Sequence, residues 1–365
     1  MTENVFAFCG EQLVHQLRES NGQRLNMEER WNSLALDIIG RSVFNYDFGS
    51  VTEESSVIKA VYNTLKEAEH RSTFYLPYWN LPFADKIVPR QRSFQRDLRL
   101  INDVLTSLIR QAQETRNEAD AEELKERDYE STSDPSLLRF LVDLRGEEAT
   151  DKQLRDDLMT MLVAGHETTA SVLTWATYCL ALDGEQLRLV QEEVDSVLAD
   201  KVRPDYDDVK AMPRIRRAIA ESLRLYPQPP LLIRRALEDV ELPGGEVVSK
   251  GQDVFLSVYN IHRSPEYWNN PNTFDLTRWD RRSDTPEQTG DKGWQGYNPE
   301  GWKGLYPNET ASDYAFLPYG GGATFAYHPL KCPFSQRSML LYDLLLCSCH
   351  VFQFTGPRCA IMLST

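Results

Sequence analysis

One apolar segment, residues 154–182, limits what this 365-residue chain can fold into more than any other feature. Thr150 and Gln153 precede it in the pattern of a capping box, where a threonine hydroxyl and a glutamine side chain satisfy each other's free amides. Gly184 follows the segment and favours a helix stop. The pattern predicts one long helix, the most apolar of the chain, buried among other elements.

The residues on either side of this segment are also mostly helical by their apolar spacing. Helical periodicity predicts helices within 1–45, 53–70, 90–123, 136–145, 185–198 and 213–226. A run with two prolines, 76–82, must interrupt them, because proline removes a backbone donor and fixes φ.

The apolar period changes to two after residue 227. This change predicts short strands and a hairpin at 240–242, 247–248 and 254–259. Residues 264–310 are rich in Pro, Asn, Gly and Trp and are expected to form packed coil. The expected fold is therefore mainly α with a small β portion.

Charge and cysteine content exclude several classes of protein. The chain has 40 Lys and Arg against 55 Asp and Glu, a net charge of −15, so nucleic-acid backbones are not expected partners. No stretch reaches the ~18 uninterrupted apolar residues of a membrane span, and we expect no signal or transit peptide in this chain. Six cysteines are too few for a disulfide framework, which favours a reducing compartment.

The end of the chain differs in composition from the rest. Residues 323–365 hold four of the six cysteines but only four of the 95 charged residues. The sequence therefore predicts a main domain over 1–322 and an anomalous tail over 323–365.

A polar run, Ala-Gly-His-Glu-Thr-Thr at 164–169, interrupts the long apolar helix. Glycine there costs about 1 kcal/mol relative to alanine, and buried polar side chains need partners. One interpretation is a solvated kink, because threonine can bond back to a carbonyl one turn earlier. The other is a site in which Gly165 leaves room for a ligand while Glu167 and Thr168 handle protons. A zinc helix would require histidine at position 170, which is Ala170.

Two further patterns are weak when taken alone. Glu221 and Arg224 share a helix face, which is typical of an exposed ion pair worth ~0–1 kcal/mol, with Arg278 as a possible third partner. Phe316 begins a run that ends in Gly320, Gly321 and Gly322, whose backbone can lie close to a flat ligand. Glycine runs of this kind are more often simple turns.

Taken together and in this order, the three patterns resemble the cytochrome P-450 superfamily. That family has an Ala-Gly-x-Glu-Thr helix across the haem face, a Glu-x-x-Arg helix locked to a downstream arginine, and a Phe-x-x-Phe-Gly-Gly-Gly loop. The resemblance covers residues 1 to 322. Longer stretches resemble the plant and algal carotenoid hydroxylase branch: 36–46, 69–72, 138–143, 155–160 and 227–235.

The resemblance implies a role for each matching residue. Glu167 and Thr168 would deliver protons to dioxygen, and Ala164 and Gly165 would line the oxygen site. Glu221, Arg224 and Arg278 would form a buried structural triad. Arg234 would pair with a haem propionate, and Phe316 and Gly320 would belong to the haem loop.

Two departures concern the haem ligand and the chain's start. The family places the ligating cysteine at position 326, which is Ala326 here. Cys332 comes six residues late and Cys359 much later, so the tail is interpreted as a retained intron or frame error, or else as an inserted loop that ligates through Cys332. We expect that this chain does not bind haem productively. The family's anchor, first strands and early helices, and a plastid-targeting segment, are expected before residue 1.

The resulting hypothesis is a haem-dependent monooxygenase that hydroxylates a hydrophobic substrate, a carotenoid ring, with electrons from a redox partner. The full-length parent would be a plastid protein associated with the membrane. One alternative is a non-catalytic fragment without haem, whose Cys347, Cys349 and His350 scavenge zinc. Another is a hydroxylase of fatty acids or other lipids.

Overall fold

The computed structural model describes residues 2–52, 55–115, 136–145, 150–199, 201, 203–242, 244–279 and 315–318. The chain divides into two compact units, Met1–Ala170 and Ser171–Thr365. The predicted coil at 280–310, the glycine run 320–322 and the tail 323–365 lie outside the described residues, as does the predicted helix end at 116–123.

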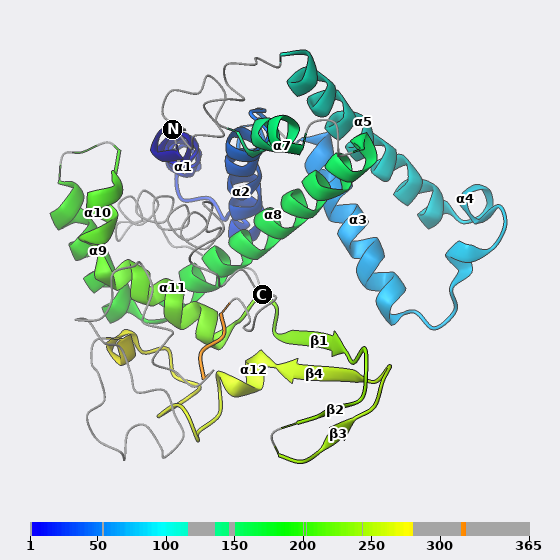
Figure 1. Ribbon diagram of the computed structural model, residues 1–365. Coiled ribbons are helices and arrows are strands. Elements are labelled where there is room, and N and C mark those ends of the chain that lie inside the picture. Colours follow the sequence, from blue (N-terminus) through cyan, green and yellow to red (C-terminus); the bar gives the residue numbers. More distant parts are fainter. Residues whose placement is uncertain are drawn as a thin grey trace. The chain divides into compact units, whose positions relative to one another are not determined.

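The described residues of the first unit form helices joined by turns and coil, with no strand among them (Figure 1). Its helices are α1 Thr2–Glu19, α2 Met27–Val43, α3 Ser56–Thr73, α4 Ala84–Ile87, α5 Pro89–Glu114, α7 Leu137–Arg145 and the first part of α8 Asp151–Leu182. The helical period over 1–45 is divided between two helices, because Asn21 and Gly22 adopt positive φ angles of 47° and 83°. Such a left-handed turn ends a right-handed helix.

The core of this unit forms where α2 meets its neighbours. The predicted apolar face of α2 is buried as expected: Trp31, Leu34, Ala35, Ile38 and Ile39. Side chains from α3, α5, α7 and α8 complete one apolar cluster, which includes Val61, Ile101, Leu138 and Leu158. Each fully buried leucine or isoleucine contributes about 1.5–3 kcal/mol, so this cluster holds α8 in place.

The connection from α3 to α5 follows the predicted proline break. A single 3-10 turn, η1 Tyr78–Asn80, lies in it, and Pro89 occupies the first turn of α5. Glu67 of α3 is 3% exposed and pairs with Arg71 and with Arg90 of α5. These guanidinium groups hold the pKa of Glu67 below its usual value against the effect of burial, and the ion pairs join α3 to α5.

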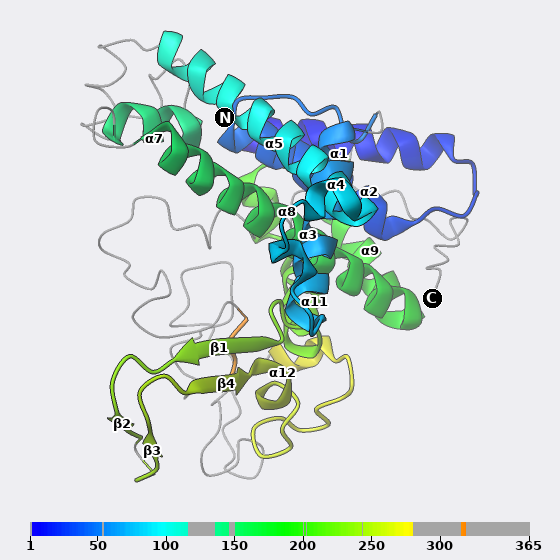
Figure 2. The same cartoon turned by 90° about the vertical axis from the view of Figure 1, so that its right-hand side faces the viewer.

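The second unit combines helices with two small antiparallel sheets. It contains the end of α8, α9 Gly184–Leu198, α10 Tyr206–Lys210, α11 Pro213–Leu225, β1 Leu231–Arg235, β2 Val240–Glu241, β3 Val247–Val248, β4 Asp253–Ser257, α12 Val258–Ile261 and η2 Leu276–Trp279. Strand β1 pairs with β4, from Leu231 opposite Ser257 to Arg235 opposite Asp253. The β2–β3 hairpin extends beyond this pair (Figures 1 and 2).

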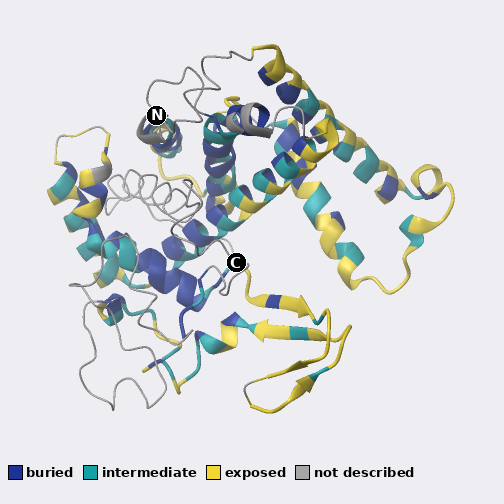
Figure 3. Ribbon diagram, viewed as in Figure 1, coloured by how far each residue is buried: buried dark blue, intermediate teal, exposed yellow. Residues whose placement is uncertain are grey.

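The predicted strand 254–259 begins one residue after β4 does and ends two residues after it. The chain turns into α12 after Ser257, whose hydroxyl accepts the Asn260 amide at 3.3 Å and caps the helix. Helix α11 is buried along nearly its whole second half, whereas the strands are mostly exposed (Figure 3). Polar side chains on the buried half of α11 therefore need hydrogen-bond partners inside the protein.

Across the described ranges, no helix combines the length and apolar character needed to cross a bilayer.

Candidate functional site

The polar run of α8 presents two different faces. Ala164 and Thr168, one turn apart, lie on an accessible face, whereas His166 and Thr169 are buried. The Thr168 hydroxyl donates to the Ala164 carbonyl oxygen at 2.6 Å. This is the backbone bond expected for a threonine in a helix, and the helix continues without interruption from Asp151 to Leu182.

Glu167 is the ionisable side chain on the accessible part of this turn. Partial burial of its carboxyl group raises its pKa, and the charges of Glu69 and Glu28 raise it further. A carboxyl group with a raised pKa takes up and releases protons closer to neutral pH. Glu167 therefore has the chemistry of a proton donor at the surface of α8.

Gly165 has a packing role. A Cβ atom at this position would lie 2.6 Å from the Ile39 Cδ1 atom of α2. The missing side chain lets α8 and α2 approach closely. A role beside a ligand, as the resemblance implies for Gly165, stays a prediction.

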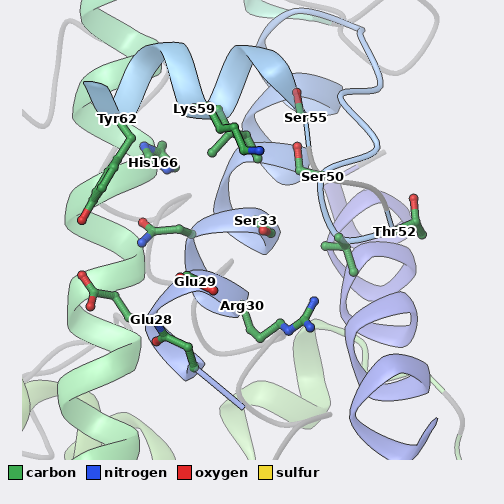
Figure 4. Close-up of a pocket in the computed structure, with 14 residues that line it drawn as sticks. Glu28, Glu29, Arg30, Ser33, Ser50, Thr52, Ser55, Lys59, Tyr62 and His166 are labelled. Carbon is green, nitrogen blue, oxygen red and sulfur yellow. The ribbon is translucent and has the colours of Figure 1, made fainter. Parts of the chain in front are cut away.

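His166 lies at a polar pocket of about 440 Å³ between α2, α3 and α8 (Figure 4). Its ring is 1% exposed, and within the described residues neither nitrogen has a hydrogen-bond partner. Burial lowers its pKa to about 4, so the ring is neutral at pH 7. Two carboxylates and two cations line the same pocket: Glu28, Glu29, Arg30 and Lys59. The charges balance, and the pocket suits water or another uncharged polar molecule.

Glu221 and Arg224 form a buried pair, contrary to the exposed pair that is usual for this spacing. Both side chains are 0% exposed, and Arg224 Nη2 donates to Glu221 Oε1 at 2.7 Å. Arg278 Nε reaches the same oxygen at 3.2 Å, and Trp279 Nε1 donates to Glu221 Oε2 at 3.1 Å. The structure thus brings together the three residues that the resemblance grouped as a triad.

Arg224 also binds three backbone carbonyl groups in two segments of the chain. Its guanidinium donates to the carbonyl oxygens of His262 at 2.8 Å, Pro271 at 2.6 Å and Thr273 at 3.1 Å. The guanidinium also lies over the ring of Trp268, with 5.2 Å between the guanidinium carbon and the ring centre. A buried guanidinium whose N–H groups all find acceptors in this way is tolerated in the interior, whereas an unpaired buried charge is strongly destabilising.

Arg234 and Arg235 of β1 differ in their partners. Arg235 pairs with Asp253 through two bonds of 2.8 Å. Arg234 is exposed and donates to the Ile233 carbonyl oxygen at 2.9 Å, and no carboxylate in the described part of the chain pairs with it. Its guanidinium is free to bind a carboxylate from a ligand.

Phe316 is 2% exposed and packs among three aromatic rings. Its ring centre lies 5.0 Å from that of Trp279, 5.2 Å from that of His262 and 6.1 Å from that of Trp268. Gly320, the other predicted loop residue, lies outside the described residues.

Neither described cysteine has the character of a metal ligand. Burial raises the pKa of the Cys9 and Cys179 thiols to about 12, and ligation requires a thiolate. Cys332 and Cys359 lie outside the described residues, as do the cysteines and histidine of the suggested zinc site. Where the structure describes side chains, no three His, Cys, Asp or Glu residues cluster as metal ligands.

Sequence reasoning missed three members of the buried network: His262, Trp268 and Trp279. Trp279 directly follows Arg278 in the sequence, and this adjacency could have placed it in the network. His262 gave none, because a lone histidine after a short strand has no pattern of its own.

The fold and these sites define a class: a mainly helical protein with a polar turn in one long helix and a buried glutamate–arginine network in another. The family model for cytochrome P450 matches residues 1–325, and the chain belongs to the cytochrome P450 family.

Individual relatives agree with this assignment. The chain is 50% identical to cytochrome P450 97B1, chloroplastic, of Pisum sativum, over 95% of this chain and 64% of the pea protein. It is 44% identical to the carotene epsilon-monooxygenase, chloroplastic, of Arabidopsis thaliana, over 93% of this chain and 58% of that protein. The haem domain of a cytochrome P450DA mutant superposes with a TM-score of 0.69 at 24% identity, covering 95% of this chain and 65% of that one. The chain thus spans less than two thirds of these relatives.

Proposed function

We propose that the full-length protein is a haem-dependent monooxygenase that hydroxylates a carotenoid ring. The observation that carries this proposal is the accessible turn of α8, where Thr168 lies beside Glu167, whose pKa is raised, in a chain of the cytochrome P450 family. The substrate class is supported by the name of the Arabidopsis relative, a carotene epsilon-monooxygenase. The names of the pea and Arabidopsis relatives also support a plastid location.

Two described residues, one in each unit, have the chemistry that a haem cofactor would need. Arg234 offers a guanidinium that no carboxylate among the described residues pairs with, which suits a propionate. Ala164 presents a small side chain on the accessible face of α8, which a flat ring could approach. When bound, haem supplies the activation of dioxygen. The thiolate that holds it would come from the tail, through Cys332 or Cys359, because the thiols of Cys9 and Cys179 are protonated.

The chain's own residues would divide the remaining work. Glu167 passes a proton from solvent towards the Thr168 hydroxyl, which can donate and accept. The network of Glu221, Arg224 and Arg278 holds the backbone at His262, Pro271 and Thr273. A redox partner would supply the electrons. The main domain would end near residue 322, before the tail.

One measurement tests this proposal: the reduced carbon-monoxide difference spectrum of the expressed chain after addition of haem. In this chain we expect no thiolate-type Soret band, so Cys332→Ser and Cys359→Ser should leave the spectrum unchanged. A band that is lost in Cys332→Ser and retained in Cys359→Ser would instead assign the ligand to Cys332. The reverse pattern assigns it to Cys359. If no variant and no preparation shows the band, this chain is a fragment that cannot carry the activity.

Substrate class is tested separately in a protein that shows the band. A carotene should shift the Soret spectrum at lower concentration than a long-chain fatty acid does. The opposite order would contradict a carotenoid substrate and favour a lipid hydroxylase.

A further inference from the structure

His262 connects two segments that are far apart in the sequence. Its backbone oxygen accepts the Arg224 Nη1 bond at 2.8 Å, and its ring Nε2 accepts the Leu317 amide at 2.7 Å. Arg224 belongs to the buried network around Glu221. Leu317 precedes Gly320 by three residues. One residue therefore joins the buried network to the chain that leads into the glycine run.

The His262 ring is suited to accept a hydrogen bond. It is 0% exposed, and burial, aided by the positive charge of Arg224, lowers its pKa to about 3. The ring is therefore neutral at pH 7. A neutral imidazole offers one acceptor nitrogen, whereas a protonated ring offers only donors.

Two consecutive residues are held at this point. Phe316 inserts its ring between His262 and Trp279, and Leu317 donates its amide to His262. A side-chain contact alone would fix a position. A backbone bond on the next residue also fixes the direction in which the chain leaves the cluster.

We propose that His262 is a positioning residue for the segment 315–318: its imidazole anchors the Leu317 amide and so sets how this segment leaves the aromatic cluster around Phe316. This rests on the proposed function, in which the chain that follows this segment supplies the haem ligand. The role differs from that of Glu221, Arg224 and Arg278, whose bonds to one another do not reach residues 315–318.

Two polar substitutions of His262 separate anchoring from general stability. His262→Gln places an amide oxygen near the position of Nε2, so it should retain the bond to Leu317. His262→Asn is shorter and should leave Leu317 without its acceptor. In the expressed chain, amide hydrogen exchange at Leu317 should be at least about fivefold faster in His262→Asn than in His262→Gln, since a hydrogen bond of this kind contributes about 1 kcal/mol.

Two controls identify a local effect. Exchange at Ile219, a buried residue of α11, should stay within about twofold of the wild-type rate in both variants. His15→Asn changes an exposed histidine of α1 and should alter neither amide. Equal exchange at Leu317 in the two His262 variants would overturn the proposal, and so would acceleration at Ile219 that matches that at Leu317.

The spectrum with carbon monoxide separates this inference from the proposed function. Where the wild-type chain shows a thiolate-type band, its amplitude should persist in His262→Gln and fall in His262→Asn. If the wild-type chain shows no band, the proposed function fails for this chain, and the exchange rates at Leu317 still decide the role of His262.

Discussion

Thr168 and Thr160 make the same local bond in α8 but should differ in function. Each hydroxyl donates to the carbonyl oxygen four residues earlier, at 2.6 Å for Thr168 and 2.9 Å for Thr160. In the haem-loaded protein, Thr168→Ala should retain substrate binding while electrons are diverted to peroxide, because the hydroxyl that passes protons is lost. Thr160→Ala, the matched control, should leave product formed per electron unchanged. Unchanged coupling in Thr168→Ala would rule out the proton role.

Glu221 should contribute to folding and not to chemistry. Glu221→Gln removes the charge that balances two guanidinium groups, Arg224 and Arg278, in the interior. We expect it to destabilise the second unit by about 3–5 kcal/mol, measured by urea unfolding, because an unpaired buried charge remains.

Glu185→Gln is the matched control for this substitution. Glu185 also pairs with an arginine three residues later, Arg188, but both side chains are exposed. Solvent screening should therefore make its loss small. A Glu221→Gln protein as stable as Glu185→Gln would show that the buried network adds nothing to folding.

At the scale of elements, the packing of α8 on α2 gives a test of Gly165. Gly165→Ala should gain about 1 kcal/mol of helix propensity but lose about 1–3 kcal/mol to overpacking against Ile39. The single substitution is expected to be neutral to destabilising. In an Ile39→Val background, which removes the Cδ1 atom, Gly165→Ala should become stabilising.

A double-mutant cycle on unfolding free energies measures this coupling. A coupling between Gly165→Ala and Ile39→Val above about 0.5 kcal/mol would confirm that glycine is needed for helix contact. Additive effects would mean that Ile39 does not limit the space, and would favour a ligand as the reason for glycine.

The helices were predictable from sequence because their signals are local. The start of α8 at Asp151 follows Thr150, whose hydroxyl accepts the Gln153 amide at 3.2 Å, one of the two bonds of the predicted capping box. The missed elements are short. Strand β1 has no alternating pattern, because only Leu232 is buried among its five residues. Helix α10 depends on a capping box between Asp205 and Asp208 that has no apolar run after it.

The buried network could be predicted only in part. Its three charged members were found through the resemblance, since their spacing alone favours an exposed pair. Burial of Glu221 depends on Trp268 and Trp279, which come 47 and 58 residues later in the chain. Contacts over such separations are set by tertiary packing, and neither periodicity nor spacing encodes them.

At the scale of the whole molecule, the described part of each unit contains one buried neutral histidine, and this gives the stability of the protein a pH dependence. The pKa is lowered from 6.5 to about 4 in His166 of the first unit and to about 3 in His262 of the second. Burial is the main cause in both. Glu28, Glu29, Arg30, Lys59 and Tyr62 line the pocket beside His166, and their charges largely cancel.

The unfolded chain binds protons that the folded chain does not, because each histidine titrates near pH 6.5 once unfolded. Stability should therefore be greatest above pH 6.5 and fall as the pH decreases towards 4. One proton per histidine corresponds to a slope of about 1.4 kcal/mol per pH unit.

The experiment is urea unfolding between pH 4.5 and 7.5, with amide exchange in α2 and α11 as separate probes of the two units. In His166→Leu, the pH slope of the free energy measured in α2 should fall by about one proton's worth, while the slope measured in α11 should not change. In His262→Gln, the slope measured in α11 should fall and the slope in α2 should not change. His15→Leu, at an exposed histidine, is the control and should change neither slope. A wild-type slope that persists in His166→Leu would mean that the folded ring is protonated near pH 6.5, contrary to its burial between α2, α3 and α8.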